Sequence, residues 1–577
     1  MPEKPRDISE AQHFLAGSYS RNGNNQCGAT NSVDPPTSQY SELEPDSNGE
    51  DGYDNSSSED ERVATGSLYV GTLIALESQQ SPNYLKQHFR IAPDIPSLRP
   101  GTMVAVEATT DDGRRSRILE RVINAWEINP HEDAFSSNLR EVIPIRTEYA
   151  SEGSSTVIYR VAEIEPLKEA ILDENDAVIK IRDVQTLPRA GALVYVATND
   201  QIVKALGLES NPNRGIYVGK VRGSKVSIYL KRDVIQRHIL IVGGIGTGKS
   251  YTRGVLAEEL WMLGVPQVNI DVNGEMVEAA KELGGLNLEP GVDFQLPLSA
   301  LTADDVINAI PSLNGNMVDL VRHAHEELLK VSRKSGVHFV LDNLLDKIKE
   351  VGPDLEMKPV TIKPAVGRTE SLRRIKYLGT PYDWKAALTP GAFININCKG
   401  LLVSDLRIIT AAVARDLQRL GQAKEFPFVA FSIDEFHLVT PNNQDSVALQ
   451  VIRELARIGR HLRIGLILTT QSPQDVDRSI LKRLLTRFLH AIEPDQLEAL
   501  RGVLSDASDD LVKQLPKMPQ GTCILTGAYE TIRHATVIKV RDRSTTHGGA
   551  TPDIWSDFEA AGWVGKKSIS QPEETHE

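Results

Sequence analysis

Residues 238–250 read HILIVGGIGTGKS, and this stretch decides the fold. Its first residues are mostly apolar and predict a short buried strand, and the residues after them match the frame G-x-x-x-x-G-K-S. A helical pattern, YTRGVLAEEL, begins directly after the frame. A glycine-rich loop between a strand and a helix can curl its backbone N–H groups around a phosphate, with the helix N-terminus behind it. We therefore expect a nucleotide site here rather than a chance glycine-rich turn.

The residues of this loop have separate expected roles. Lys249 would reach the β- and γ-phosphates, and Ser250 would ligate Mg²⁺. ATP and Mg²⁺ are therefore the expected cofactors. The nucleotide-binding residues are expected to be Gly243, Gly244, Ile245, Gly246, Thr247, Gly248, Lys249, Ser250 and Tyr251.

A second apolar run ends in a pair of acids. The segment FPFVAFSIDEFHLVTP (426–441) predicts a strand over 428–433 that delivers Asp434 and Glu435 at its carboxyl end. Ligand sites of open α/β sheets lie at that edge. One carboxylate there can coordinate Mg²⁺ while the next polarises a water. The alternative interpretation is that the two acids cap the N-terminus of a helix. The glycine-rich loop in the same chain favours the catalytic interpretation.

Two more strand ends carry polar residues. QVNID ends at Asp271, with Glu275 shortly after it, and RIGLILTTQ ends at Gln471. A lone acid at a strand end is usually a helix cap, but a polar residue such as Gln471 beside the acid-bearing strand can sense a γ-phosphate through water. An arginine before this strand could reach a neighbouring subunit's nucleotide, or simply be surface charge. The candidates are Arg453, Arg457, Arg460 and Arg463.

The chain divides into four predicted parts. Residues 1–64 hold thirteen Asp and Glu against four Lys and Arg and few large apolar residues, so we expect a disordered acidic tail. Residues 65–230 hold short β-like runs that predict a small barrel or sandwich for assembly or partner contact, or for plain packing. Residues 231–545 predict an α/β ATPase core. Residues 546–577 are a C-terminal tail, and the stretch VRDRSTTHGGATPDIW is expected to leave the core. The β-like runs are SLYVGTLIAL, GTMVAVEA, EVIPIRTEYA, VIYRVAEI, GALVYVA and KVSIYL.

A helical insertion is expected inside the core. Lys249 and Asp434 are far apart for a minimal nucleotide core, and residues 300–390 between them are mainly helical in pattern. The insertion ends in a basic stretch, 358–376, in which six Lys and Arg face one acid, Glu370. This stretch could follow a phosphate backbone or be an ordinary solvated face. The candidate DNA contacts are Arg368, Arg373, Arg374 and Lys376.

Charge and composition leave a DNA-binding function open. The formal net charge of the 577 residues is −14, of which the acidic tail contributes −9, so overall charge does not argue against a local basic path. The cysteines Cys27, Cys398 and Cys523 form no metal pattern and suit a reducing cytosol. No apolar run approaches a membrane span and no signal peptide is recognisable, so we expect a cytoplasmic protein.

In this order the motifs resemble those of the HerA family, of the HerA–FtsK branch of RecA-like ATPases, over roughly residues 66–555. The resemblance rests on Arg237-His238, GGIGTGKS, DVNGE (271–275), IDEFH (433–437) with Pro441, RIGRHLRIGLILTTQSPQDVD (457–477), MPQGTCILTG (518–527) and VRDRSTTHGG (540–549). It implies a RecA-like P-loop core preceded by a HAS-barrel-like β domain. Two features depart from the family: Asn273 stands where the family often has His, and the acidic extension is additional.

The resemblance also implies roles and partners. It places Asp434 on Mg²⁺, Glu435 as the catalytic base, Gln471 as a sensor, and Arg460 and Arg237 as arginines that act on a neighbouring subunit's nucleotide. It implies a homohexamer that translocates double-stranded DNA, with the C-terminal tail on a neighbouring subunit. HerA proteins act with a NurA-like nuclease in end processing, or with effectors such as sirtuin-type NADases in phage defence. Such a partner would dock on the barrel face.

Two other functions remain alternatives. A nucleotide-bound ring could act as a scaffold that assembles and activates an effector with little translocation. A secretion-type coupling ATPase is the third possibility, and the missing membrane segment counts against it. The predicted catalytic residues favour the translocase.

Overall fold

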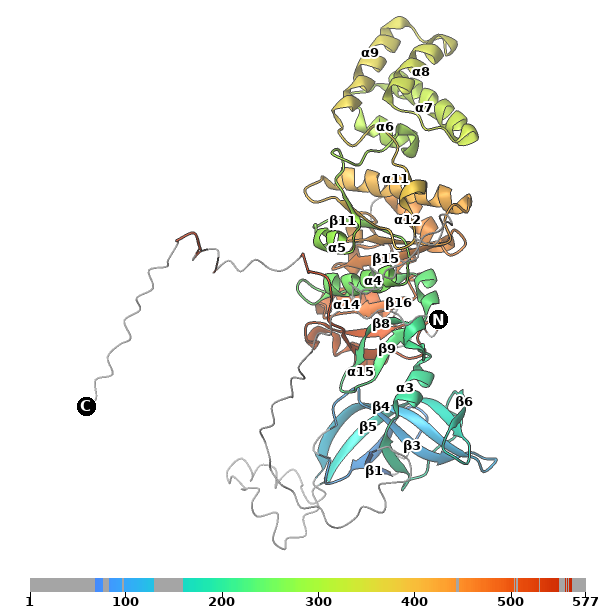
Figure 1. Ribbon diagram of the computed structural model, residues 1–577, viewed down its shortest axis with the longest axis vertical. Helices are drawn as coiled ribbons and strands as arrows, with labels where there is room; N and C mark the ends of the chain where they lie inside the picture. Colours follow the sequence, from blue (N-terminus) through green and yellow to red (C-terminus); the bar gives the residue numbers. More distant parts are fainter. Residues whose placement is uncertain are drawn as a thin grey trace, which may run out of the picture.

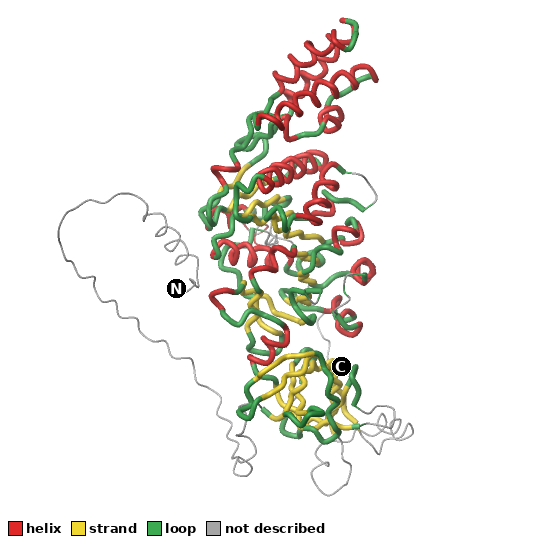
Figure 2. Tube along the Cα trace, turned by 90° about the vertical axis from the view of Figure 1, so that its right-hand side faces the viewer, coloured by secondary structure: helices red, strands yellow, loops and turns green. Residues whose placement is uncertain are grey.

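The computed structural model describes residues 68–548 except 76–81, 96–97, 129–158, 443–445, 503, 505–506 and 529, and also 556, 558 and 560–562. The described chain is elongated, with a β domain at one end, a large sheet in the middle and a group of helices at the other end (Figures 1 and 2). The predicted acidic tail 1–64 lies outside the described residues, as do most of the tail 546–577 and the β-like run EVIPIRTEYA.

The N-terminal β domain is a closed barrel. Its strands follow the order β2-β1-β7-β3-β4-β5-β6, and an additional pairing of β2 with β5 closes the barrel and leaves β6 on its outside. The strands are β1 (Tyr69–Ile74), β2 (Gln87–Ile91), β3 (Met103–Thr109), β4 (Arg115–Ile128), β5 (Tyr159–Leu172), β6 (Val178–Arg182) and β7 (Leu193–Val196). Helix α3 (Asn199–Leu206) follows them. The expected barrel is confirmed.

Buried charges connect the barrel to the rest of the chain. Arg121 of β4 is almost fully buried, pairs with Glu165 of β5, and donates a hydrogen bond to the backbone carbonyl of Ala535. Ala535 directly precedes strand β18 (Thr536–Val540) of the central sheet. Because a buried guanidinium needs partners for its N–H groups, this contact holds the two parts together.

The central sheet has the order β12-β13-β11-β14-β15-β10-β16-β17-β18-β8-β9. The strands from β12 to β16 are parallel, and the pairs from β16 to β9 are antiparallel. The strands are β8 (Ile216–Val221), β9 (Ser227–Leu230), β10 (Ile239–Val242), β11 (Gln267–Asp271), β12 (Leu286–Leu288), β13 (Phe393–Asn397), β14 (Val429–Ile433), β15 (Ile464–Thr470), β16 (Thr486–Leu489), β17 (Thr522–Thr526) and β18 (Thr536–Val540). This α/β architecture confirms the predicted RecA-like P-loop core.

One predicted boundary needs correction. We expected residues 65–230 to form the β domain, but β8 and β9 extend the central sheet through the pairing of β18 with β8. The register Ile538↔Val221 places the apolar residues of β8 against the sheet rather than in the barrel. Ile216 and Val218 are accordingly buried in the same cluster as β10 residues. Residues 216–230 therefore belong to the core.

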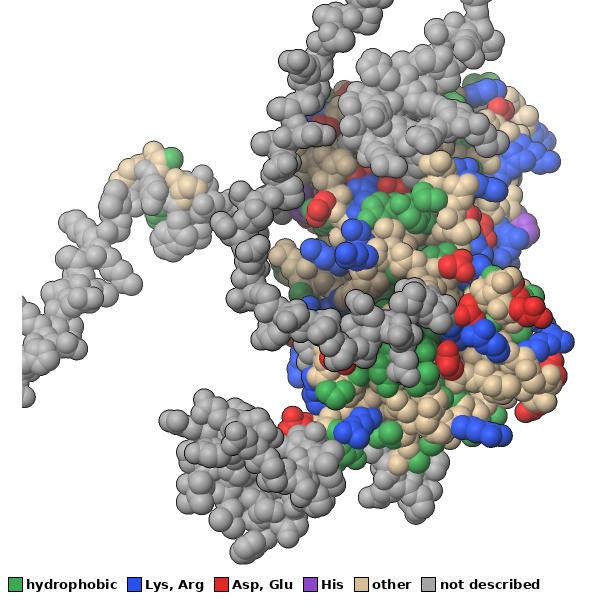
Figure 3. All heavy atoms as spheres, turned by 60° about the horizontal axis from the view of Figure 1, so that its bottom comes forward, with side chains coloured by type: hydrophobic (Ala, Val, Ile, Leu, Met, Phe, Trp, Pro, Cys, Tyr) green, Lys and Arg blue, Asp and Glu red, His purple; other side chains and the backbone are tan. Residues whose placement is uncertain are grey.

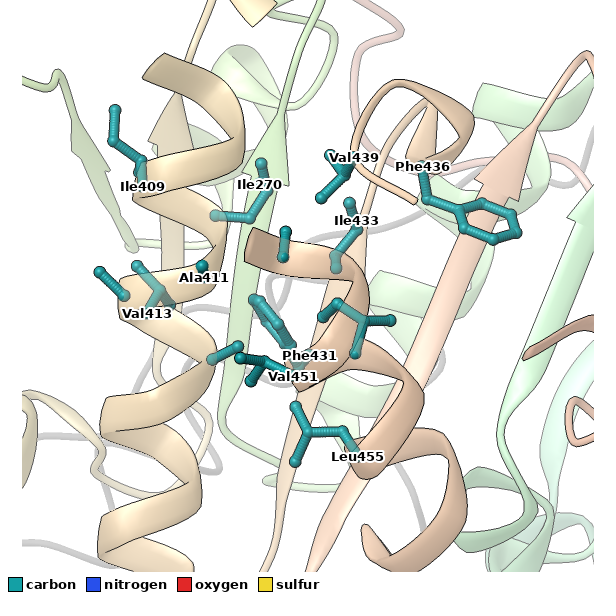
Figure 4. Close-up of a cluster of buried hydrophobic side chains, with 14 of the residues drawn as sticks. Ile270, Ile409, Ala411, Val413, Phe431, Ile433, Phe436, Val439, Val451 and Leu455 are labelled. Carbon is teal, nitrogen blue, oxygen red and sulfur yellow. The ribbon is translucent and has the colours of Figure 1, made fainter. Parts of the chain in front are cut away.

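Helices cover the faces of the central sheet. Ile433 and Phe431 of β14 point between α11 and α12, where Val413, Val451 and Leu455 surround them (Figure 4). The helices that follow the strands are α4 (Lys249–Met262), α5 (Val277–Glu282), α11 (Val403–Gln422), α12 (Val447–Ile458), α13 (Arg478–Leu481), α14 (Pro494–Arg501) and α15 (Asp509–Val512). Burial of this parallel sheet on both faces explains why its strands are continuous apolar runs in the sequence.

The expected helical insertion lies at the end opposite the barrel (Figure 1). Its helices are α6 (Ala303–Ala309), α7 (Gly315–Ser335), α8 (Leu341–Asp354), α9 (Pro359–Thr369) and α10 (Trp384–Ala387). Their apolar faces join the main core cluster, which includes Leu320, Ile348 and Ala365. Among the described residues, no helix combines the length and apolar character that a membrane crossing needs. Cys398 and Cys523 are buried free thiols.

Candidate nucleotide site

The loop after β10 has the shape that phosphate binding requires. Gly246 and Gly248 have φ angles of 73° and 114°, a region that L side chains rarely adopt. A Cβ atom on Gly243 would lie 2.6 Å from Cβ of His490, so this position has no room for a side chain. Lys249 is buried, and its Nζ donates a hydrogen bond of 3.0 Å to the carbonyl of Gly244. The ammonium is therefore held inside the curl of the loop.

A cavity of about 810 Å³ opens beside this loop. It brings together the loop, Glu435 and Gln471, which are far apart in the sequence. The expected nucleotide-binding residues that line it are Ile245, Gly246, Gly248, Lys249, Ser250 and Tyr251. Gly243, Gly244 and Thr247 form the loop behind this wall and do not line the cavity. A volume of this size suits a ligand as large as a nucleoside triphosphate.

Glu435 faces the cavity from a strained backbone position. Its φ of 41° and ψ of 47° place a non-glycine residue in the left-handed region. Its Oε2 atom accepts a hydrogen bond of 3.4 Å from the backbone N–H of Gln471 and lies 3.3 Å from Nδ1 of His437. Backbone strain of this kind is concentrated at functional sites. The carboxylate is thus fixed where it can accept a proton from a water.

Asp434 lies behind the cavity wall, in a cluster of buried charges. Burial raises the pKa of Asp434 to about 6, although Arg253 opposes the shift. Arg253 Nη1 is 3.6 Å from Asp434 Oδ2, and its Nη2 is 3.3 Å from Asp271 Oδ1. Asn273 Nδ2 donates a hydrogen bond of 3.4 Å to Asp434 Oδ2. Asn273, the position that departs from the family, therefore contacts the proposed metal-binding carboxylate.

We did not predict Arg253 from the sequence. It stands four residues after Lys249 on α4, so the two side chains emerge on the same face of the helix. That spacing from Lys249 is the signal that could have identified it. The side chain is 1% exposed, which a guanidinium tolerates only among carboxylates.

The residues around Asp434 fit a bound Mg²⁺. Asp271, Glu275 and Asp434 surround the buried guanidinium of Arg253, and the Oε2 atom of Glu275 is buried without a hydrogen-bond partner. Mg²⁺ is usually held by one or two carboxylates together with substrate phosphates. Ser250 and Asp434 are the residues that would hold it. When bound, the cation would neutralise charge on the phosphates.

The two expected finger arginines lie away from this cavity. Arg237 ends the 3₁₀ helix that precedes β10, and Arg460 lies in the turn before β15. Because β10 and β15 are parallel neighbours, both arginines lie at the amino edge of the sheet, whereas the cavity is at its carboxyl edge. Arg237 forms an ion pair with Glu530, and Arg460 is exposed. The sheet separates both from the cavity of their own chain.

In the structure, part of the positive charge of the basic stretch (358–376) is paired with nearby acids. Most of its residues lie on α9 and the following 3₁₀ helix (Glu370–Arg374), in the helical insertion. Arg373 pairs with Asp342 of α8 and lies 3.7 Å from Glu370, while Arg368 donates to the carbonyl of Ser312. Arg374 and Lys376 are exposed. The folding of α8 onto α9 therefore adds an acid that the linear sequence does not show.

The C-terminal stretch is a further correction. We expected residues 540–555 to leave the core, but residues 541–548, which we call the strap, pack on α4. Arg541 forms ion pairs of 2.8 Å with Glu258 and 3.1 Å with Glu259. Glu258 Oε1 also accepts hydrogen bonds from the backbone N–H groups of Ser544 and Thr545. The two glutamates are buried in α4 and need these donors, which explains why the strap stays on the core.

Sequence comparison agrees with this architecture. A family model described as "Helicase HerA, central domain" matches residues 216–417, which begin at β8 and contain the phosphate loop and the helical insertion. Residues 216–417 match the central domain of the HerA family, and the chain is similar to HerA relatives over a longer stretch. Its HerA-family core is an ATP-hydrolysing P-loop enzyme.

Individual relatives are distant in sequence but similar in extent. The chain is 24% identical over 405 residues to the DNA double-strand break repair helicase HerA of Sulfurisphaera tokodaii, covering 65% of this chain and 78% of the relative. It is 22% identical over 394 residues to the protein of the same name from Sulfolobus acidocaldarius, with the same coverage. Among solved structures, VirB4 of Thermoanaerobacter pseudethanolicus matches with a TM-score of 0.44 at 16% identity, covering 57% of this chain and 97% of VirB4.

Proposed function

We propose that this HerA-family protein is an ATP-driven translocase of double-stranded DNA that works as a homohexameric ring in the cytoplasm. The observation that carries the proposal is that the two edges of one sheet hold different parts of the proposed catalytic machinery. Its carboxyl edge holds the phosphate loop, Glu435 and Gln471 around one cavity, and its amino edge holds two arginines that cannot reach that cavity. A second copy would supply the missing arginine.

Within one subunit, each residue of the site has a proposed role. Lys249 binds the β- and γ-phosphates, and Ser250 and Asp434 hold Mg²⁺. Glu435 accepts a proton from the attacking water, and Gln471, which is hydrogen-bonded to Glu435 through its backbone, senses the γ-phosphate. The residues proposed to bind ATP and those proposed to hydrolyse it follow different strands. A shift of one strand end would therefore change the geometry of the whole site.

Ring assembly gives the distant arginines a role. A head-to-tail ring places the amino edge of one subunit beside the carboxyl edge of the next, so every interface is the same. In that arrangement Arg460 is the proposed finger, because it is exposed and its guanidinium can neutralise charge on the transferred phosphoryl group. Arg237 is a second proposed contact, and it would first have to leave Glu530.

DNA and a partner effector are further parts of the proposal. The relatives named DNA double-strand break repair helicase HerA support double-stranded DNA as the polymer that is moved. The barrel is the proposed docking face for a NurA-like nuclease, or for another effector such as a sirtuin-type NADase, in end processing or phage defence. On the face seen in Figure 3, apolar side chains lie among charged ones, and Tyr84 and Leu85 of the barrel are 53% and 80% exposed.

DNA stimulation of ATP hydrolysis tests this proposal. The rate would be measured for the full-length protein without DNA, with linear duplex and with an equal mass of a non-nucleic polyanion such as heparin. We expect duplex DNA to raise the rate and heparin not to replace it. A rate that is the same in all three conditions would favour a nucleotide-bound scaffold over a translocase.

A further inference from the structure

The strap forms one wall of the nucleotide cavity. His547 of the strap lines the cavity together with Tyr251, the residue directly after Ser250. The two rings are stacked, with their centroids 6.1 Å apart and their planes inclined by 22°. An aromatic pair therefore lies next to the phosphate loop, on a segment that we expected to leave the core.

Several contacts hold the strap rigidly against α4. The backbone N–H of Arg543 donates a hydrogen bond of 2.6 Å to Oη of Tyr251, which fixes the tyrosine ring. Thr546 donates its backbone N–H to Glu282 at 2.9 Å, directly before His547. The guanidinium of Arg543 occupies the space that a Cβ atom on Gly254 would need. The ring pair is therefore built into the fold before any ligand arrives.

The chemistry of this wall differs from that of the phosphate loop. Burial lowers the pKa of His547 below its ordinary value, so at neutral pH its ring is uncharged. An uncharged imidazole and a phenol contribute aromatic faces rather than charge to the cavity. Gln520 and Asp542 line the same cavity and offer an amide and a carboxylate as hydrogen-bonding groups. Flat apolar faces with polar groups nearby suit a heteroaromatic base, not a phosphate.

We propose that Tyr251 and His547 form a stacking platform for the purine base of the bound nucleotide, and that the strap fixes this platform. The inference deepens the proposed function, since it rests on ATP as the ligand of the cavity. Tyr251 directly follows the residues proposed to bind the phosphates, and His547 lines the same cavity beside it. Stacking against a ring fixed in advance costs little ordering entropy on binding.

Comparing the binding of an ATP analogue with the binding of inorganic tripolyphosphate tests the platform, because the second ligand has phosphates but no base. Binding of a non-hydrolysable ATP analogue and of tripolyphosphate would be measured by calorimetry, with Mg²⁺, on the full-length protein. For His547→Ala we expect about a tenfold or greater loss of affinity for the analogue, the size of one lost base–aromatic stack. Affinity for tripolyphosphate should stay unchanged, and His547→Phe should restore analogue binding.

Two controls separate the possible outcomes. Lys249→Ala should weaken both ligands, and His323→Ala, at a half-buried histidine of α7 that does not line the cavity, should weaken neither. Equal losses of both ligands in His547→Ala would show that the strap shapes the phosphate loop and would overturn the base platform. Unchanged binding of both would overturn it as well. Neither hydrolysis nor DNA enters the measurement, so a protein that binds the base but ignores DNA would refute the translocase and leave the platform standing.

Discussion

Arg253 and Asp434 form an ion pair in the interior of the core, with 3.6 Å between Nη1 and Oδ2 and side-chain exposures of 1% and 2%. Asp271 contacts the same guanidinium from the neighbouring strand. One cation thus connects the helix of the phosphate loop with the ends of β11 and β14. It holds Asp434 in place behind the cavity wall.

Removal of this guanidinium should destabilise the core. Arg253→Gln leaves Asp271 and Asp434 buried without their cation, and we expect a loss of about 3–5 kcal/mol in the free energy of unfolding. Chemical denaturation followed by circular dichroism measures it. Arg322→Gln is the matched control, because it breaks an exposed pair of 2.7 Å with Asp304 and should cost about 0–1 kcal/mol. Equal losses of stability in the two variants would show that the buried ion pair contributes no more than the exposed one.

Glu435→Gln should separate ATP binding from ATP hydrolysis. The amide keeps the size of the side chain but cannot accept the proton of the attacking water, so turnover should fall roughly 10²-fold or more. Binding of ATP and assembly of the ring should persist, and both are measurable on the same preparation by calorimetry and light scattering. Near-normal hydrolysis by this variant would remove Glu435 from the role of base.

Mixing two inactive variants should restore activity if Arg460 acts across an interface. Lys249→Ala subunits lack the phosphate contact, and Arg460→Ala subunits lack the finger. In a hybrid ring, an intact Arg460 can face an intact Lys249 on the next subunit, so partial recovery of ATP hydrolysis is expected. If the subunits exchange and the mixture stays inactive, the arginine acts within its own chain or is structural.

Neutralising the basic stretch should change how DNA binding responds to salt. Arg368, Arg373 and Arg374 would contact phosphates rather than base edges, so their triple alanine variant should bind more weakly and lower the salt slope by roughly one unit per lost contact. ATP hydrolysis without DNA should survive. Because Arg373 pairs with Asp342, single substitutions would show whether Arg374 contributes more. An unchanged salt slope would show that this stretch does not contact DNA, and the arginines between 453 and 463 would be the next candidates.

The sequence predicts where candidate site residues lie when they are close together in the chain. The phosphate loop and the pair Asp434 and Glu435 each lie within one strand-to-loop segment, so their spacing alone predicts their position. Arg237 and Arg460 were predicted from separate segments, and the parallel pairing of β10 and β15 places both at the same edge. Their distance from the cavity is a consequence of the fold, not of any local pattern.

Features that depend on packing between distant segments were not predictable in this way. In β4, buried Arg117 and Arg121 interrupt the apolar pattern, because their partners Asp176 and Glu165 lie outside this strand. In the sequence, the strap is typical of an exposed polar tail. In the structure, it pairs with the buried Glu258 and Glu259. Polar residues that are buried through tertiary contacts carry no periodic signal in the sequence.

Displacement of a third DNA strand measures the central claim most directly. A triplex-forming oligonucleotide bound to a linear duplex reports movement along the duplex, and its release would be followed by fluorescence with ATP, with a non-hydrolysable analogue, and with the Glu435→Gln variant. We predict release with ATP and the unaltered protein, and none in the other two reactions. ATP hydrolysis at a normal rate without release of the third strand, on protein confirmed to be hexameric and bound to the duplex, would contradict translocation.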